Sequence, residues 1–320
     1  MVHVTRRAAL ATGLAAPALA QPRWMPDRPI RMIIPWPAGG SADAQLRAMA
    51  ESVARSLGQP VVVDNRGGAG GTLHAIHLAR EARPDGMTVG QMHLSVIRRP
   101  LLVRVPQWNA VTDFTHIIGL SGWLFGVAVR ADAPWRDFRE MLEDARRRPG
   151  ALSFATSGVA TTNHLAMEEI CAREGVELLH VPFRGSNEAI APVLNGQVNM
   201  IADSSTWAPQ VEAGTMRLLC VWSAARARRF PNVPTLLELG YDMVVTSNYG
   251  LSGPPGMDGG IVRSLHDAFR EALFTDANAR VRDQFDMPLV YLDSEAYTEF
   301  GRQRLEQERG IIARLGIRLE

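Results

Sequence analysis

Residues 35–43 read Pro-Trp-Pro-Ala-Gly-Gly-Ser-Ala-Asp and lead from an apolar strand, predicted at residues 30–35, into a helix. The apolar side chains of this helix recur at helical spacing, at Leu46, Met49, Ala50, Val53 and Leu57. Because side chains are nearly absent at residues 38–40, a ligand can approach the backbone N–H groups at the positive end of the helix dipole. The pattern suits a carboxylate site, but a tight turn that Ser41 or Asp43 caps is the commoner use of one such helix start taken alone.

A second helix start has the same chemistry. A strand predicted at residues 152–155 runs into residues 156–164, which read Thr-Ser-Gly-Val-Ala-Thr-Thr-Asn-His. Ligands of open parallel sheets lie beyond the carboxyl ends of the strands, where both of these segments fall. We therefore expect the two helix starts to face one cleft and to hold one anion between them.

Two charged residues follow other predicted strands. Arg184 lies in Pro182-Phe183-Arg184-Gly185, and Asp203 follows a strand predicted at residues 198–202. Arg184 would add positive charge for carboxylate recognition, and Asp203 would accept a hydrogen bond from a ligand hydroxyl, an ammonium group or a bound water. A surface arginine and a helix cap explain these two loop positions equally well.

Short apolar strands alternate with amphipathic helices along the chain, which predicts an α/β protein with parallel sheets in two doubly wound lobes. The helical patterns near the C-terminus need a sheet to cover, and the first predicted sheet has room for them. We therefore expect lobe 1 at residues 21–123 and 247–320 and lobe 2 at residues 124–246. A ligand cleft should lie between the lobes, with two crossing hinge strands.

Residues 1–20 have the composition of an export signal. Arg6 and Arg7 precede an Ala/Leu-rich run without acidic residues, and Ala18-Leu19-Ala20 is a small-x-small cleavage pattern before Gln21. The arginine pair fits a twin-arginine signal, but the general secretory route also needs basic residues, so both routes stay open. The run is too short to anchor the protein in a bilayer. The sequence predicts a soluble periplasmic protein.

The composition excludes several classes of function. The formal net charge is +1, so the chain lacks the basic excess that is typical of nucleic-acid binding. The sequence contains no lysine, which excludes a P-loop lysine, a pyridoxal phosphate Schiff base and a lysine general base. Cys171 and Cys220 lie in apolar runs and are predicted to be two buried thiols rather than a disulfide. His74 and His77 lack a third metal ligand nearby, which favours solvent or capping roles.

Many short motifs, in this order and spacing, resemble the Bug family of periplasmic substrate-binding proteins of tripartite tricarboxylate transporters. The matching pieces extend over nearly all of the chain after residue 20. They are Pro29-Ile30-Arg31, segment 35–43, segment 58–66, Gly68-Ala69-Gly70-Gly71, Pro84-Asp85-Gly86 with Thr88, Asp113-Phe114-Thr115, Ser157-Gly158 with His164-Leu165, segment 181–185, Asn195-Gly196-Gln197-Val198, and segment 229–235 with Glu238 and Gly240.

The chain departs from the family pattern at three places. Trp36 stands where the family usually has phenylalanine, and Gly67 stands where proline is common. Asn248 opens a segment where a tryptophan commonly begins the return strand. Because we expect Trp36 and Asn248 to line the cleft, these departures bear on the identity of the ligand rather than on the fold.

The resemblance implies a type II periplasmic-binding-protein fold and the capture of a small organic acid by lobe closure. It also implies docking on large and small membrane subunits of a transporter. We expect a monomer that needs no cofactor, binds no nucleic acid and catalyses no reaction. A ligand sensor that docks on a membrane signalling protein has the same fold, so this alternative stays open. A secreted hydrolase has less support, because the sequence has no Gly-x-Ser-x-Gly or His-Glu-x-x-His motif.

The residues predicted to bind the ligand come from the two helix starts and the neighbouring strand ends. They are Trp36, Gly39, Gly40, Ser41, Asp43, Ser157, Gly158, Thr161, Thr162, His164, Arg184, Gly185 and Asp203. Backbone N–H groups at residues 39–41 and 158–162 should meet the carboxylate groups, while Arg184 and Asp203 adjust specificity. No metal ligand is predicted.

Export should remove residues 1–20, because the small residues before Gln21 suit the specificity of a signal peptidase. We expect the mature protein in the periplasmic fraction, with Gln21 as its first residue. Cell fractionation followed by N-terminal sequencing measures both properties. Recovery of the full-length chain, still beginning with Met1, from the cytoplasm would contradict this prediction.

Overall fold

Strand β1 (Ile30–Ile34) is the apolar run that precedes Pro35, and four of its five side chains are buried. The computed structural model describes residues 23–319 and places β1 in a 6-stranded sheet of order β11-β4-β10-β3-β1-β2. β1 pairs in parallel with β2 and β3, whereas β10 runs antiparallel to β3 and β4. The other strands of this sheet are β2 (Val61–Asn65), β3 (Thr88–His93), β4 (Thr115–Gly122), β10 (Asn248–Gly253) and β11 (Leu289–Leu292).

A second, 5-stranded sheet has the order β7-β6-β8-β5-β9. β6 pairs in parallel with β7 and β8, while β5 runs antiparallel to β8 and β9. The chain thus passes from the first sheet to the second between β4 and β5, and returns between β9 and β10. The strands of the second sheet are β5 (Phe125–Arg130), β6 (Ser153–Thr156), β7 (Leu179–Pro182), β8 (Met200–Ser204) and β9 (Met216–Val221).

Both sheets are mixed, so the prediction of parallel sheets is wrong for the strands next to the crossings. β4 leads through Trp123 and Leu124 directly into β5. β5 begins beside the carboxyl end of β8, because Phe125 pairs with Ser204, and it therefore runs in the opposite direction. A strand that arrives directly from the other sheet needs no crossover helix, so the alternation of strands and helices does not reveal its direction.

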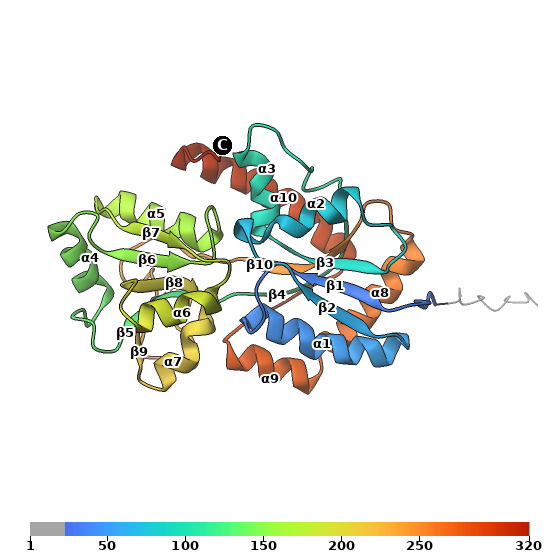
Figure 1. The fold of residues 1–320 in the computed structure, drawn as a ribbon, viewed down its shortest axis with the longest axis horizontal. Coiled ribbons are helices and arrows are strands. Elements are labelled where there is room, and N and C mark those ends of the chain that lie inside the picture. Colours follow the sequence, from blue (N-terminus) through green and yellow to red (C-terminus); the bar gives the residue numbers. More distant parts are fainter. Residues whose placement is uncertain (1–22, 320) are drawn as a thin grey trace, which may run out of the picture.

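Helices cover both faces of each sheet (Figure 1). On the first sheet, α1 packs against α8 and α9 on one face, and α3 packs against α10 on the other. These helices and α2 are α1 (Ser41–Leu57), α2 (Leu73–Arg80), α3 (Leu94–Leu102), α8 (Gly259–Leu273), α9 (Asp276–Gln284) and α10 (Ser294–Leu315). The helices of the second sheet are α4 (Phe138–Arg147), α5 (Thr162–Glu174), α6 (Ser186–Leu194) and α7 (Ala208–Glu212). Short 3₁₀ turns are η1 (Ala69–Gly71) and η2 (Ser205–Trp207).

The cysteines are unpaired. Cys171, in α5, and Cys220, in β9, are both free and buried. Burial raises the pKa of each thiol to about 12, so both stay protonated and unreactive at neutral pH. The prediction of two buried thiols is confirmed.

The two neighbouring histidines of α2 have different environments. His74 is fully buried, and its Nε2 lies 2.7 Å from the backbone oxygen of Gln91. The solvent or capping role predicted for His74 is therefore wrong, because the residue fills the core between α2 and β3. His77 pairs with Glu81 at 2.8 Å. Within residues 23–319, no group of His, Cys, Asp and Glu side chains is arranged to hold a metal ion.

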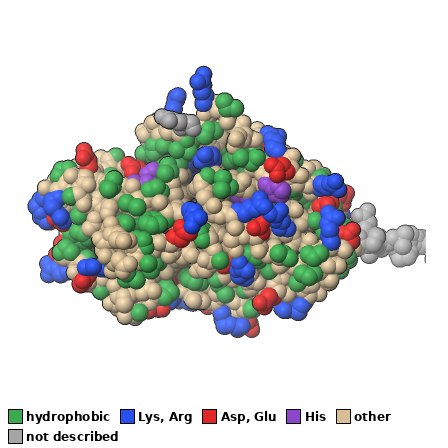
Figure 2. Space-filling model, in the orientation of Figure 1, with side chains coloured by type: hydrophobic (Ala, Val, Ile, Leu, Met, Phe, Trp, Pro, Cys, Tyr) green, Lys and Arg blue, Asp and Glu red, His purple; other side chains and the backbone are tan. Residues whose placement is uncertain are grey.

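The surface carries charges of both signs. On the face that Figure 2 shows, basic and acidic side chains lie interspersed rather than in one large patch. Among the helices that the structure describes, none combines the length and the apolar character needed to cross a membrane.

Gly250 of β10 lies where neighbouring elements leave no room for a side chain. A Cβ atom there would collide with the carbonyl oxygen of Ile118 and lie 2.7 Å from the ring of Tyr297. We expect Gly250→Ala to lower the free energy of unfolding by about 1–3 kcal/mol, the usual cost of overpacking.

Gly310, on the exposed side of α10, is the matched control. A Cβ atom at Gly310 meets nothing within 4 Å, so Gly310→Ala should raise the free energy of unfolding by up to about 1 kcal/mol through helix propensity. Urea unfolding followed by circular dichroism measures both variants. Equal midpoints for Gly250→Ala and the unchanged protein would contradict the packing argument.

Candidate functional site

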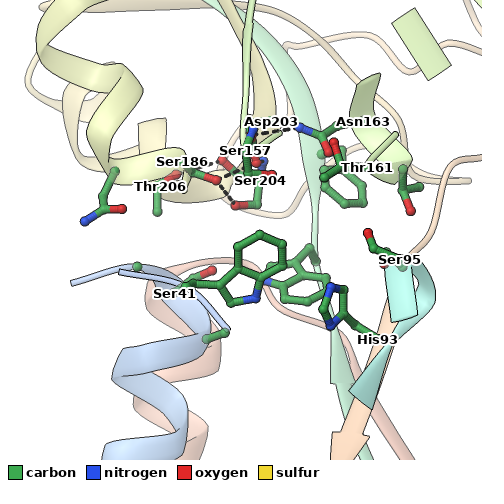
Figure 3. Close-up of a pocket in the computed structure, with 18 of the residues that line it drawn as sticks. Ser41, His93, Ser95, Ser157, Thr161, Asn163, Ser186, Asp203, Ser204 and Thr206 are labelled. Atoms are coloured by element: carbon green, nitrogen blue, oxygen red, sulfur yellow. Dashed lines mark hydrogen bonds between the residues drawn. The ribbon is translucent and has the colours of Figure 1, made fainter. Parts of the chain in front are cut away.

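A cavity lies between the two sheets, beyond the carboxyl ends of several strands (Figure 3). The volume open to the centres of water molecules is about 40 Å³, which is room for about three waters. The residues that line it are Trp36, Gly40, Ser41, Ala42, Asp43, His93, Ser95, Trp123, Phe125, Ser157, Thr161, Thr162, Asn163, Ser186, Asn187, Asp203, Ser204, Thr206 and Ser247.

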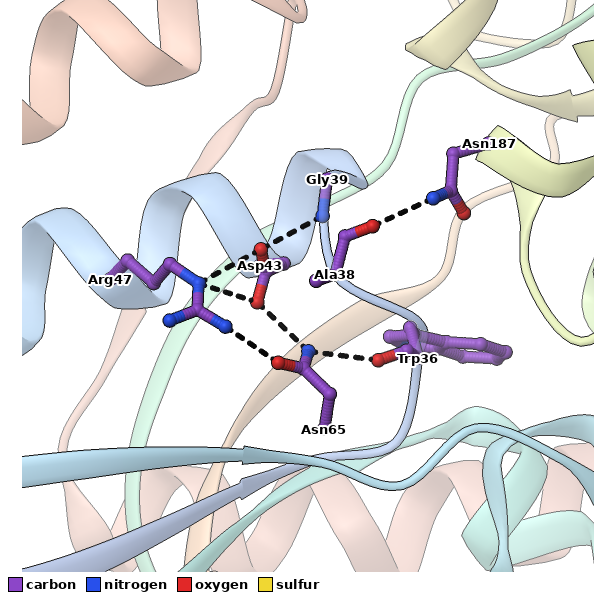
Figure 4. A network of polar contacts seen from close by, with 7 residues as sticks. All are labelled: Trp36, Ala38, Gly39, Asp43, Arg47, Asn65 and Asn187. Atoms are coloured by element: carbon purple, nitrogen blue, oxygen red, sulfur yellow. Dashed lines mark hydrogen bonds and ion pairs between the residues drawn. The ribbon is translucent and has the colours of Figure 1, made fainter.

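Helix α1 begins at this cavity, and its N-cap residue, Gly40, has no side chain to cap it. The first helical hydrogen bond runs from the N–H of Ala44 to the carbonyl of Gly40. The N–H groups of residues 41–43 therefore have no acceptor within the helix. The N–H of Gly39 is not free, since it donates to Asp43 Oδ2 at 2.9 Å (Figure 4). The prediction that Gly39 offers its N–H to a ligand is corrected accordingly.

Asp43 is the centre of a polar network that holds this turn (Figure 4). Its carboxylate accepts hydrogen bonds from Arg47 Nε at 2.9 Å and from Asn65 Nδ2 at 2.8 Å. Burial raises the pKa of Asp43, but the bonds from Arg47, Gly39 and Asn65 outweigh burial and hold the pKa below its usual value. Asn65 also donates to the carbonyl of Trp36 at 2.9 Å. Asp43 thus stabilises the turn before α1 through the N–H of Gly39 and caps no N–H group of the helix itself, and its charge is paired with that of Arg47.

Helix α5 begins at the opposite wall of the cavity. Its N-cap residue, Thr161, makes no side-chain cap, because its Oγ1 donates to the carbonyl of Gly158 at 2.7 Å. The first helical hydrogen bond runs from Leu165 to Thr161, which leaves the N–H groups of residues 162–164 without a helical acceptor. Two helix starts from different sheets therefore present free N–H groups at one cavity, where the helix dipoles favour an anion.

Asp203, at the end of β8, is fully buried. It links the segments that form the cavity wall on the side of the second sheet. Its Oδ2 accepts from the N–H of Ser157 at 2.5 Å and from Asn163 Nδ2 at 2.7 Å. Its Oδ1 accepts from the hydroxyl of Ser186 and from the N–H of Ser204. Burial raises the pKa of Asp203, and these donors act in the opposite direction. Since four donors already occupy the carboxylate, its contribution is to orient the segments around the cavity.

Aromatic rings form much of the wall on the side of the first sheet. The rings of Trp36 and His93 lie 5.0 Å apart, and Trp36 meets Trp123 edge to face at 6.2 Å. Trp123 packs in turn on Tyr249 at 4.4 Å. Burial and the nearby His74 lower the pKa of His93 to about 3, so its ring is neutral at physiological pH. Among the described residues that line the cavity there is no Arg or Lys.

The structure brings together eight of the thirteen residues predicted to bind the ligand. Those lining the cavity are Trp36, Gly40, Ser41, Asp43, Ser157, Thr161, Thr162 and Asp203, whereas Gly39, Gly158, His164, Arg184 and Gly185 do not line it. The Arg184 side chain is 73% exposed and pairs with Glu188. His164 stacks on the ring of His180 at 3.9 Å. Contact of the first eight with a ligand stays a prediction.

Gly158 and Gly185 lie where the two sides of the cleft touch. A Cβ at Gly158 would lie 3.0 Å from Cα of Gly70, and one at Gly185 would lie 2.6 Å from Cδ of Pro37. These glycines permit close approach of the two sides and do not form the cavity wall. At the return crossing, Ser247 lines the cavity in place of the predicted Asn248.

Several lining residues were not predicted from the sequence. They are Ala42, His93, Ser95, Trp123, Phe125, Asn163, Ser186, Asn187, Ser204, Thr206 and Ser247. Asn163 and Ser204 adjoin residues that were predicted, and widening each segment by one residue would have included them. His93, at the carboxyl end of β3, could have been found by the strand-end argument used for Asp203, whereas Trp123 gives no such signal because it lies at the crossing between the sheets.

Comparison with known proteins identifies a family of receptors that this chain matches over most of its length. Residues 45–317 match the model of the tripartite tricarboxylate transporter family receptor. A protein of Cupriavidus necator described as "UPF0065 protein in gbd 5'region" is 42% identical over 311 residues, which cover 97% of this chain and 94% of that protein.

Two solved structures are similar over most of their length. The periplasmic binding protein BugD has a TM-score of 0.87 at 28% identity, covering 92% of this chain and 100% of its own. R. palustris Rpa4515, solved with adipate, has a TM-score of 0.85 at 26% identity, covering 92% and 99%. The predicted two-lobed periplasmic-binding-protein fold is confirmed by these likenesses.

The role of Asp203 is testable without a ligand. In Asp203→Asn an amide nitrogen would face two hydrogen-bond donors, so we expect the free energy of unfolding to fall by about 1–3 kcal/mol. Asp242→Asn, at an exposed carboxylate, is the control and should change the free energy of unfolding by less than about 0.5 kcal/mol. Thermal and urea unfolding measure both variants. Equal free energies of unfolding for Asp203→Asn and Asp242→Asn would contradict the view that the four donors need the Asp203 carboxylate as their acceptor.

Proposed function

The chain belongs to the tripartite tricarboxylate transporter receptor family, and on this premise we propose that it captures a small organic acid in the periplasm for a membrane transporter. Proteins of this family are receptors rather than enzymes. The acid is held by hydrogen bonds and packing contacts, and no covalent step is involved. We infer that residues 21–123 with 247–320 and residues 124–246 are the two lobes that close on it.

One observation carries this proposal: two helix starts without side-chain caps, one from each sheet, line the same cavity. An acid bound there would accept hydrogen bonds from N–H groups at the starts of α1 and α5. Each charge-assisted hydrogen bond of this kind contributes about 1.5–3 kcal/mol. The aromatic rings of Trp36 and Trp123 would then contact the apolar part of the acid. The adipate bound to Rpa4515 supports a carboxylate as the ligand.

Contacts across the cleft support capture by closure. Asn187, at the start of α6, donates to the carbonyl of Ala38 at 2.7 Å, beside the start of α1. On the other side of the cavity, Arg98 of α3 donates to the carbonyl of Ala160 at 2.9 Å. Both bonds join segments of different sheets, so both would break when the lobes separate to admit or release the ligand.

A thermal-shift screen tests the class of ligand. Purified mature protein is screened against di- and tricarboxylates, aromatic acids and acidic amino acids, with neutral amides of the same acids as controls. At 100 times its dissociation constant a ligand stabilises the protein by about 2.7 kcal/mol, which is readily detected as a shift in Tm. We expect at least one acid, and not its amide, to stabilise the protein. Stabilisation by amides alone would contradict the proposal.

Two matched variants test the place of binding. Gly40 has an ordinary φ of −79°, and the nearest atom to a new Cβ is 4.0 Å away, so Gly40→Val should fold normally. Its side chain would block the approach to α1, and we expect calorimetry to detect no binding of the acid. Arg184→Ala removes an exposed side chain outside the cavity and should leave the affinity unchanged. Unchanged affinity in Gly40→Val would place the ligand elsewhere.

A further inference from the structure

Arg98 of α3 is a buried cation directly behind the cavity wall. Its side chain is 2% exposed and lies against Glu308 of α10, which is fully buried. Arg98 Nε donates to Glu308 Oε2 at 2.6 Å, and Arg98 Nη2 donates to Oε1 at 3.0 Å. Arg304 also donates to Glu308, at 3.0 Å. Two guanidinium groups therefore share one carboxylate, which leaves this cluster with a net positive charge.

The same guanidinium reaches across to the start of α5. Arg98 Nη1 donates to the carbonyl of Ala160 at 2.9 Å, and Nη2 donates to Thr162 Oγ1 at 3.3 Å. Ala160 has a φ of 58°, the left-handed region that a residue with a Cβ avoids. The backbone N–H of Ala160 is also occupied, since it donates to His164 Nδ1 at 3.1 Å. Arg98 thus supports a loop conformation that is unfavourable by itself.

The contact with Arg98 fixes the direction of the Thr162 hydroxyl. A threonine hydroxyl has one proton to donate, and a guanidinium can only donate, so Oγ1 must be the acceptor in this pair. The proton of Thr162 is then left for another acceptor. Thr162 lines the cavity, and the nearby carbonyl of Gly158 already accepts from Thr161. A carboxylate oxygen in the cavity is the acceptor that this arrangement fits.

We propose that Arg98 is a positioning residue for ligand binding, which makes the Thr162 hydroxyl a hydrogen-bond donor to the bound acid and ties α10 to the loop at residues 158–161. This inference rests on the proposed function for the identity of the ligand. It gives Arg98 an indirect role, through Thr162 and the carbonyl of Ala160, in a cavity whose described lining holds no Arg or Lys.

Hydrogen–deuterium exchange tests the position of Arg98 without any ligand. In Arg98→Lys the charge remains but the fork that contacts both Ala160 and Thr162 is lost. We expect faster exchange in peptides covering residues 158–166 and unchanged exchange in α6. Arg309→Ala, which removes an exposed guanidinium from α10 beside Glu308, is the control and should change neither region. Unchanged exchange at residues 158–166 in Arg98→Lys would overturn the tie between α3, α10 and this loop.

Affinity measurements test the action through Thr162. The titrant is adipate, with the best-stabilising acid of the thermal screen in parallel. Thr162→Val should weaken binding roughly tenfold to a hundredfold, the range for one charge-assisted hydrogen bond. Thr162→Ser should restore most of the affinity that Thr162→Val loses, because it keeps the hydroxyl. In the Arg98→Lys background, Thr162→Val should cost much less, since the hydroxyl is no longer oriented.

The outcomes separate this inference from the proposed function. Equal affinities of Thr162→Val and the unchanged protein, or additive effects of the two changes, would overturn the role of Arg98. If no acid binds the unchanged protein, the proposed function fails, and the exchange measurement still decides whether Arg98 holds the loop.

Discussion

The cavity wall on the side of the second sheet depends on the hydrogen bonds that the carboxylate of Asp203 accepts. This carboxylate accepts hydrogen bonds from the loop after β6, from α5, from the start of α6 and from its own strand end. A buried donor left without an acceptor costs about 1–3 kcal/mol, so these segments are held together as one unit. The arrangement of this wall therefore depends on one buried carboxylate and its donors, and a ligand bound there would meet groups that are already oriented.

The helix starts were predictable from the sequence because their signal is local. Glycine and hydroxyl residues between a strand and an amphipathic helix are enough to place Gly40, Ser41, Thr161 and Thr162 at the carboxyl ends of strands. The fold class followed from the same local periodicity. The roles of individual groups were less predictable, because Asp43 binds the N–H of Gly39 within a network that also includes Arg47 and Asn65.

The remaining features depend on contacts between distant parts of the chain. By its loop position Arg184 is expected to bind the carboxylate of the ligand. In the structure it pairs with Glu188, one helical turn away, outside the cavity. Trp123 enters the site only because the chain crosses there between two sheets with antiparallel neighbours. The pair of Arg98 and Glu308 joins residues that are 210 positions apart, and no local pattern marks such a pair.

The cavity wall holds no arginine or lysine within the described part of the chain, and this bears on how strongly ligand binding depends on salt. Dissolved salt screens exposed charges over distances of about 8–10 Å at physiological strength, whereas enclosed groups are screened much less. If the acid is held as proposed, by helix N–H groups and hydroxyls inside an enclosed cavity, its affinity should vary little with ionic strength.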